Sequence, residues 1–357
     1  MIVRGNFSEK ISILIKEQKH SQSRWHRRLE RLLLQVHLLV QERKSMGYHP
    51  RIECKKIATF QTTRTQRSEL WFVNNTKLEE KILGFAAKYA KRYDVKLYAL
   101  AIEGNHIQFP ALFPKGNRAH FMRDFNSMVA RTVPRYQRTY PGGKLWARRY
   151  SAEYLAGEGA IEKQFFYTVL QPVYDGLVDR IEQYEWYNCF EDAIHGRVKT
   201  FKVVRWKEYN DAKRWNDKVL IEEFTDTFEL KYERLPGYEE LSQEEYITLM
   251  REKLKEWTQI AIEVRPAKKA AGREALRRVR PGSIPKHTKV SGMYDFRPRA
   301  LGEDKKSIDE ANEWYFSFHF RYKSASRRYR MGKKNVRFPK GSYKPPTFTV
   351  VDSRSTL

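Results

Sequence analysis

Residues 96–113, KLYALAIEGNHIQFPALF, form the segment that decides the fold. Apolar, β-forming residues dominate both halves of this segment, and Gly104-Asn105 between them is typical of a tight turn joining two strands. The sequence therefore predicts a pair of antiparallel strands, one at 96–103 and one at 106–113.

Further strands and helices are predicted on either side of this hairpin. They are a strand at 57–64, helices at 76–93 and 118–138, a short strand at 145–155 and a helix at 159–171 that Pro172 ends. This order predicts the α+β fold class, with an antiparallel sheet and helices on one face of it.

His106 and Gln108 are candidate metal ligands on the second strand of the hairpin. Residues two apart on a strand point to the same face and lie about 6–7 Å apart at the backbone. An imidazole nitrogen and an amide oxygen can both bind a divalent cation. A lone His-x-Gln pair is more often ordinary surface chemistry, so the pattern alone leaves both interpretations open.

Tyr167 and Gln171 are four residues apart on a predicted helix, and therefore share one face of it. A tyrosine hydroxyl can act as a nucleophile, and the neighbouring amide oxygen can share a metal ion with a histidine on a strand. Alternatively, Tyr167 packs in an aromatic cluster with Phe165 and Phe166.

Four motifs in a fixed order resemble the single-tyrosine HUH transposases, and most closely the REP-associated tyrosine transposases. The motifs are GNHIQ at 104–108, GKLWARRY at 143–150, FYTVLQPVYDGLV at 166–178 and YEWY at 184–187. The resemblance covers residues 57–187 and implies an HUH-endonuclease-like, ferredoxin-like antiparallel sheet. It also implies a DNA-cutting and DNA-joining enzyme that works as a homodimer on single-stranded or hairpin DNA.

The resemblance assigns roles to individual residues. It implies that Tyr167 attacks a DNA phosphodiester to give a 5′-phosphotyrosine link and a free 3′-hydroxyl. It implies that His106, Gln108 and Gln171 hold Mg²⁺ or Mn²⁺. Arg148, Arg149 and Tyr150 are similar to a basic strand segment that contacts phosphate and a base.

Two features depart from the family pattern. Gln108 replaces the second histidine of the strand pair, and Pro110 removes a hydrogen-bond donor from the same strand. Tyr174, seven residues after Tyr167, is a reserve nucleophile. The departures keep two alternatives open: a non-catalytic, domesticated DNA-binding protein on the same fold, and a rolling-circle replication initiator or relaxase.

The charge of the chain favours a polyanionic partner. Lys and Arg number 69 against 43 Asp and Glu, a net charge of +26. Near the C-terminus, cations alternate with aromatic rings, a pattern typical of nucleic-acid binding, although a disordered basic arm fits it as well. The predicted DNA contacts there are Arg327, Arg328, Arg330, Lys333, Lys334 and Arg337.

The composition along the chain predicts four parts. They are an N-terminal helical segment at 1–50, the transposase-like domain at 51–190, an acidic helical region at 191–264 and a basic, partly flexible extension at 265–357. No apolar run is long enough to span a bilayer, and the two cysteines lack metal-type spacing. We therefore expect a cytoplasmic, nucleoid-associated protein without a membrane partner.

Overall fold

The computed structural model describes residues 52–266, 269–285 and 300–345. Its contacts divide the chain into two compact units, residues 1–50 and residues 51–357. The predicted N-terminal helical segment at 1–50 lies outside the described residues. Among the described helices, none is long and apolar enough to cross a membrane.

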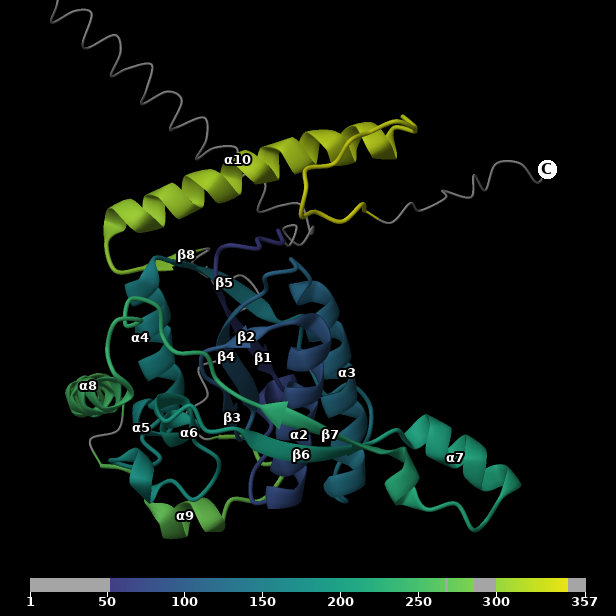
Figure 1. The fold of residues 1–357 in the computed structure, drawn as a ribbon, viewed down its shortest axis with the longest axis vertical. Helices are drawn as coiled ribbons and strands as arrows, with labels where there is room; N and C mark the ends of the chain where they lie inside the picture. The colour runs from purple at the N-terminus through teal and green to yellow at the C-terminus, as the bar shows by residue number, and fades with distance from the viewer. Residues whose placement is uncertain (1–51, 267–268, 286–299, 346–357) are drawn as a thin grey trace, which may run out of the picture. The chain divides into compact units, whose positions relative to one another are not determined.

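The larger unit is built on one six-stranded sheet (Figure 1). Its strands are β1 (Thr59–Arg64), β2 (Lys96–Leu97), β3 (Ala101–Glu103), β4 (His106–Leu112), β5 (Ser151–Ala156) and β8 (Ala300–Gly302). The order is β2-β4-β1-β5-β8, with β3 also paired to β4. All pairs are antiparallel except β5 with β8, which is parallel. The predicted α+β class is confirmed, and the sheet is a mixed one.

The hairpin predicted at 96–113 is present, but its first strand is split in two. Leu97 of β2 pairs with Ala111 and Ala101 of β3 pairs with Gln108, so the interruption lies opposite Pro110. Proline has no N–H to donate, which prevents a continuous ladder at that position. The Pro110 carbonyl still accepts a hydrogen bond from the Tyr98 N–H at 3.1 Å. A proline in an interior strand is accommodated in this way.

Helices cover both faces of the sheet, whereas the sequence predicted helices on one face. On one face lie α2 (Thr76–Tyr93) and α3 (Arg118–Tyr136), where Phe109 of β4 packs 5.7 Å from Phe121 between ring centroids. On the other lie α4 (Glu158–Val169) and α5 (Gln171–Tyr174) (Figure 1). Because side chains alternate along a strand, His106 and Gln108 point to the α4–α5 face. Nearly every β4 residue is buried, as a strand covered on both faces requires.

A second, two-stranded sheet packs against α2. It consists of β6 (Lys199–Val204) and β7 (Thr225–Leu230), with α7 (Trp206–Trp215) inserted between them. A Cβ atom on Gly84 of α2 would lie only 3.2 Å from Val203 and 3.3 Å from Phe201. The glycine therefore permits this close approach.

The remaining elements come largely from the C-terminal half. They are α6 (Phe190–Ile194), α8 (Gln243–Val264), α9 (Arg273–Arg277), α10 (Lys305–Arg330) and the 3-10 turns Gln66–Ser68, Ile181–Gln183 and Ile221–Phe224. The extension predicted to be partly flexible thus contains a helix of 26 residues. Because β8 pairs with β5, this extension also contributes to the main sheet. The division of the chain into separate parts at residues 190 and 264 stays a prediction.

Candidate active site

The break between α4 and α5 determines how Tyr167 and Gln171 lie. The sequence predicted one helix through Gln171, but α4 ends at Val169, and Leu170 has φ −94° and ψ 8°. Pro172 stands in the first turn of α5, where its missing N–H costs nothing. Burial raises the pKa of the Tyr167 phenol, and the Gln171 side chain across the break makes a small contribution in the opposite direction.

His106 is buried at 3% exposure, and its ring is held by Asn105. His106 Nδ1 lies 2.8 Å from Asn105 Oδ1, while Asn105 Nδ2 donates to the Ser68 carbonyl at 3.1 Å. The amide of Asn105 is thereby oriented with its oxygen toward the ring, so Nδ1 must carry the proton. The lone pair of the other ring nitrogen, Nε2, is left for a ligand.

The protonation state of His106 is the one that metal binding needs. Burial, together with the smaller effect of the positive charge on Arg64, lowers the pKa of His106 to about 3. Arg64 and His106 are cross-strand partners on β1 and β4. The imidazole is therefore neutral at physiological pH.

A chain of amide hydrogen bonds connects β4 with α5. Gln108 Nε2 donates to Gln171 Oε1 at 2.6 Å, and Gln171 Nε2 donates to Asp175 Oδ1 at 3.0 Å. A carboxylate only accepts, so Asp175 fixes the orientation of both amides. The side-chain oxygen of Gln108 consequently points away from Gln171 and keeps its lone pairs.

Tyr167 is half-buried and packs against the core cluster that contains Phe165 and Phe166, but its own ring contacts are with other aromatic residues. Phe166 stacks on Trp257 at 5.9 Å between centroids, whereas the Tyr167 ring contacts Phe60 at 5.9 Å and Tyr174 at 5.2 Å. Burial raises the pKa of the Tyr167 phenol, and the negative charge of Asp175 raises it further. Without a nearby cation the phenol stays protonated at neutral pH.

Sequence reasoning missed Glu103, which is opposite His106 across the β3–β4 hairpin. Directly paired residues in an antiparallel sheet point to the same face, so this carboxyl lies on the face of His106 and Gln108. Glu103 is 3% exposed, and its Oε2 atom has no hydrogen-bond partner. Burial raises the pKa of Glu103 to about 8, helped by the charges of Asp175 and Glu79. The two-residue turn at Gly104-Asn105 was the signal that could have revealed this pairing.

These residues fit a divalent cation by their chemistry. They supply one neutral imidazole nitrogen, amide oxygens and one buried carboxyl with a free oxygen, which are ligands that Mg²⁺ and Mn²⁺ accept. Within the described part of the chain, no cluster of three or more His, Cys, Asp or Glu side chains could hold a metal. A metal site here therefore depends on the amides of Gln108 and Gln171 as well.

The other predicted DNA contacts lie on separate elements. Arg148 and Arg149 are exposed, but they precede β5 instead of lying on a strand, and Tyr150 is buried at 8% exposure. The Tyr150 ring is thus not open to a base. The C-terminal contacts are on the last turn of α10 or follow it, and all of them are exposed: Arg327, Arg328, Arg330, Lys333, Lys334 and Arg337.

Comparison with known proteins finds likeness among solved structures, and it is distant. No protein-family model matches the chain, and no curated protein matches it. Among solved structures, the chain is similar to a REP-associated tyrosine transposase bound to a REP hairpin, at 14% identity and a TM-score of 0.36. The match covers 42% of this chain and 87% of that one.

Proposed function

We propose that this chain is a metal-dependent transposase that cuts and rejoins single-stranded DNA, with Tyr167 as the nucleophile. The observation that carries the proposal is the hydrogen bond from Gln108 of β4 to Gln171 of α5, at 2.6 Å. This bond brings the strand that bears His106 to the helix junction that bears Tyr167. A nucleophile, a neutral imidazole and oxygen ligands thereby gather on one face of the sheet.

The proposal includes a ferredoxin-like frame for residues 59–156. Such a frame has two β-α-β units whose first strands lie at the centre of the sheet. The order of the strands supports it, since β1 and β4 are central and β2, β3 and β5 flank them. The homodimer implied by the resemblance is likewise part of the proposal.

The proposed reaction exchanges one phosphodiester for another. The Tyr167 oxygen forms a bond to a backbone phosphorus while the bond from that phosphorus to the 3′ oxygen of the preceding nucleotide breaks. The proton lost by the phenol is balanced by the one that the leaving oxygen gains, giving a free 3′-hydroxyl. Rejoining is the reverse attack of a 3′-hydroxyl on the phosphotyrosine, which releases Tyr167.

His106, Gln108 and Gln171 would hold Mg²⁺ or Mn²⁺, and Glu103 is the residue that we add to this set. The bound cation would neutralise charge on the scissile phosphate and favour the phenolate. Glu103 supports the site because the other three ligands are neutral. With its pKa raised to about 8, the carboxyl holds a proton at neutral pH, and loss of this proton on cation binding would supply the negative charge that a hard cation prefers. The role of Asn105 is to hold the His106 ring with Nε2 unprotonated.

The proposal is tested with single-stranded oligonucleotides of randomised sequence, labelled at the 3′ end because the 5′-phosphotyrosine link retains that side. We expect a covalent protein–DNA band with Mn²⁺ that EDTA abolishes and that Tyr167→Phe removes by at least about 100-fold. Tyr209→Phe, a matched change on the exposed helix α7, should leave the band unchanged. Persistence of the band in Tyr167→Phe would overturn the assignment.

A second candidate, a non-catalytic DNA-binding protein, is favoured by one specific observation. The Gln108 amide N–H group donates to the Gln171 side-chain oxygen, so two of the proposed metal ligands are engaged with each other. This candidate predicts salt-dependent DNA binding with no covalent band in any divalent cation.

A further inference from the structure

The C-terminal half of α10 and the segment that follows it carry a dense positive charge. We call residues 321–344 the basic arm. The basic arm has ten Lys or Arg residues and no Asp or Glu, and every one of these cations is exposed. They are Arg321, Lys323, Arg327, Arg328, Arg330, Lys333, Lys334, Arg337, Lys340 and Lys344.

The basic arm is folded back on itself. Gly332, at φ +84°, ends α10, and the Lys333 N–H donates to the Arg328 carbonyl at 3.2 Å. The segment that follows α10 runs back beside it (Figure 1). Phe338 of this segment lies 5.8 Å from Tyr322 and 5.6 Å from Tyr329, between ring centroids. The cations of the helix and of the returning segment therefore belong to one folded surface.

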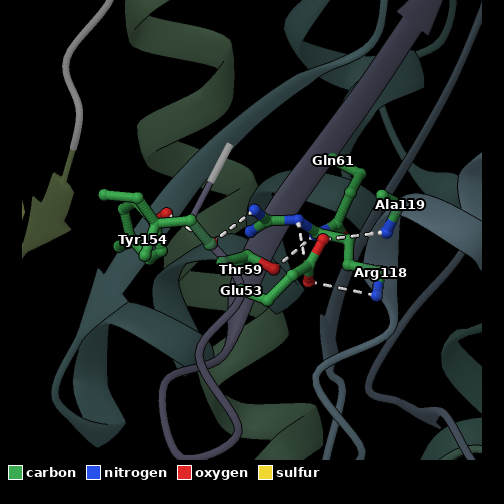
Figure 2. A network of polar contacts seen from close by, with 7 residues as sticks. Glu53, Thr59, Gln61, Arg118, Ala119 and Tyr154 are labelled. Atoms are coloured by element: carbon green, nitrogen blue, oxygen red, sulfur yellow. Dashed lines mark hydrogen bonds and ion pairs between the residues drawn. The ribbon is translucent and has the colours of Figure 1, made fainter. Parts of the chain in front are cut away.

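The returning end of the arm is fixed to the main sheet region. The Glu53 N–H donates to the Gly341 carbonyl at 2.8 Å. A Cβ atom on Gly341 would lie only 2.3 Å from the backbone carbonyl oxygen of Glu53. The Glu53 carboxylate in turn accepts from the backbone N–H groups of Arg118 and Ala119 at the start of α3 (Figure 2). The arm thus ends on a buried polar network.

The helix that carries the arm is fixed as well. Tyr315 and Phe318 of α10, just before the arm, pack in one cluster with Tyr154 and Ile52, and Tyr322 of the arm packs against this cluster. Tyr154 also donates to the Ile52 carbonyl at 2.7 Å, which joins this cluster to the network in Figure 2. The arm is consequently held in place at both ends.

The apolar side of α10 is already occupied. Residues 315, 318, 322, 325 and 329 repeat at intervals of three and four, which places them on one stripe of the helix. All five are buried or half-buried, and the cations flank the stripe on both sides. No broad apolar face of this helix is left to enter a lipid surface.

We propose that the basic arm binds the sugar–phosphate backbone of duplex DNA, as a surface separate from the Tyr167 site. Resting on the proposed function, it would hold the double-stranded part of a substrate whose single-stranded part is cut. Duplex DNA carries one negative charge per about 1.7 Å, which suits ten exposed cations carried by one folded segment.

The packing of the aromatic rings favours a duplex over a single strand. The sequence pattern suggested that rings between the cations stack on unpaired bases, but Tyr322, Tyr329 and Phe338 are half-buried against one another. Tyr343 packs edge-on against His120 at 5.9 Å and stays 43% exposed. Because three of the four rings are engaged with one another, phosphate contacts are the principal means of binding, and such contacts read no base sequence.

The test measures binding, not cutting, so that it is independent of Tyr167 chemistry. Fluorescence anisotropy is recorded with a blunt 20-base-pair duplex and with a 20-nucleotide single strand, at 50–200 mM salt in EDTA. The arm variant is Arg327→Gln/Arg328→Gln/Arg330→Gln. The matched control is Lys207→Gln/Lys213→Gln/Arg214→Gln, which removes the same charge from three exposed positions on α7.

We expect the arm variant to bind the duplex at least tenfold more weakly at 100 mM salt. The slope of log K against log salt should fall by about 0.9 for each phosphate that the arm variant no longer neutralises. The control variant should stay within about twofold of the unaltered chain. Covalent-band formation is measured separately on the unaltered chain, so a chain that lacks any covalent band would refute the proposed function and leave this inference standing.

Three results would overturn the inference. One is an unchanged duplex affinity and salt slope in the arm variant. Another is an equally weakened affinity in the α7 control, which would show that only net charge matters. The third is a greater weakening for the single strand, or for phosphatidylserine vesicles, than for the duplex.

Discussion

At the scale of single residues, Asn105 determines which nitrogen of His106 is available. Its amide is oriented by the Ser68 carbonyl, so its oxygen meets the Nδ1 proton and Nε2 keeps its lone pair. The same side chain accepts from Arg64 at 3.4 Å, which links the neighbouring strand β1 to the site. In metal-binding histidines, the ring nitrogen that does not bind the metal typically donates to a neighbouring oxygen, and His106 Nδ1 makes such a bond to Asn105.

Glu103 gives a prediction about stability and pH at this scale. The pKa of Glu103 is raised to about 8 in the folded chain, from its ordinary value of 4.5. As pH rises, the unfolded chain releases this proton first, so the free energy of unfolding falls between about pH 4.5 and pH 8, by up to about 1.4 kcal/mol per pH unit. Glu103→Gln removes this pH-dependent decrease.

The measurement is urea denaturation in EDTA at pH 5 and pH 8. From pH 5 to pH 8, the free energy of unfolding of the unaltered chain should fall by about 2 kcal/mol or more relative to that of Glu103→Gln. His106, Asp175, Glu79 and Tyr184 surround Glu103 and are present in both proteins. A difference in stability that is the same at both pH values would contradict the prediction.

Part of the site could be predicted from local sequence, and part could not. The shared face of His106 and Gln108 follows from strand alternation, which is a local property. The roles of Glu103 and Asn105 depend on the register of β3 with β4 and on burial beneath α5, both of which come from tertiary packing. The spacing of residues along the sequence indicates neither this register nor this burial.

At the scale of elements, most strands and helices were predicted close to their observed bounds. The strand at 57–64 and the helices at 76–93 and 118–138 are confirmed as β1, α2 and α3. The strand predicted at 145–155 begins only at Ser151, as β5. Two other errors lie where a proline alters the backbone: the split opposite Pro110 and the break before Pro172. In both cases the proline was visible in the sequence, but the position of the break depends on neighbouring elements.

The start of α3 provides a prediction for this scale. The Glu53 carboxylate accepts from the N–H groups of Arg118 and Ala119 at 3.1 and 3.0 Å, and it lies beside the buried Arg118 guanidinium. Glu53→Gln leaves that guanidinium buried without its counter-charge, so it should lower the free energy of unfolding by about 3–5 kcal/mol.

Urea denaturation at pH 7 checks this prediction. The control is Glu80→Gln at an exposed position, which should change stability by no more than about 0.5 kcal/mol. Replacing Arg118 with Met in addition to Glu53→Gln should restore part of the stability, because no unpaired charge then remains buried. A decrease in Glu53→Gln no larger than that of the control would show that the network in Figure 2 adds little stability.

At the scale of the whole molecule, the basic extension differs most from what the sequence predicted. Its charge and its Pro and Gly content indicated a partly flexible region, yet α10 packs on Tyr154 and the returning segment binds Glu53. The stripe of apolar residues from 315 to 329 was present in the sequence, but Tyr315 and Phe318 pack with Tyr154, more than 150 residues away. Contacts at such separation cannot be found from periodicity.

The central claim is that Tyr167 joins the DNA, and the most direct test locates the bond itself. The covalent product formed with Mn²⁺ and a single-stranded oligonucleotide is digested with nuclease and protease, and the modified peptide is sequenced by tandem mass spectrometry. We predict a 5′-phosphonucleotide on Tyr167 and none on Tyr174. A nucleotide on Tyr174, or on any residue other than Tyr167, would contradict the account.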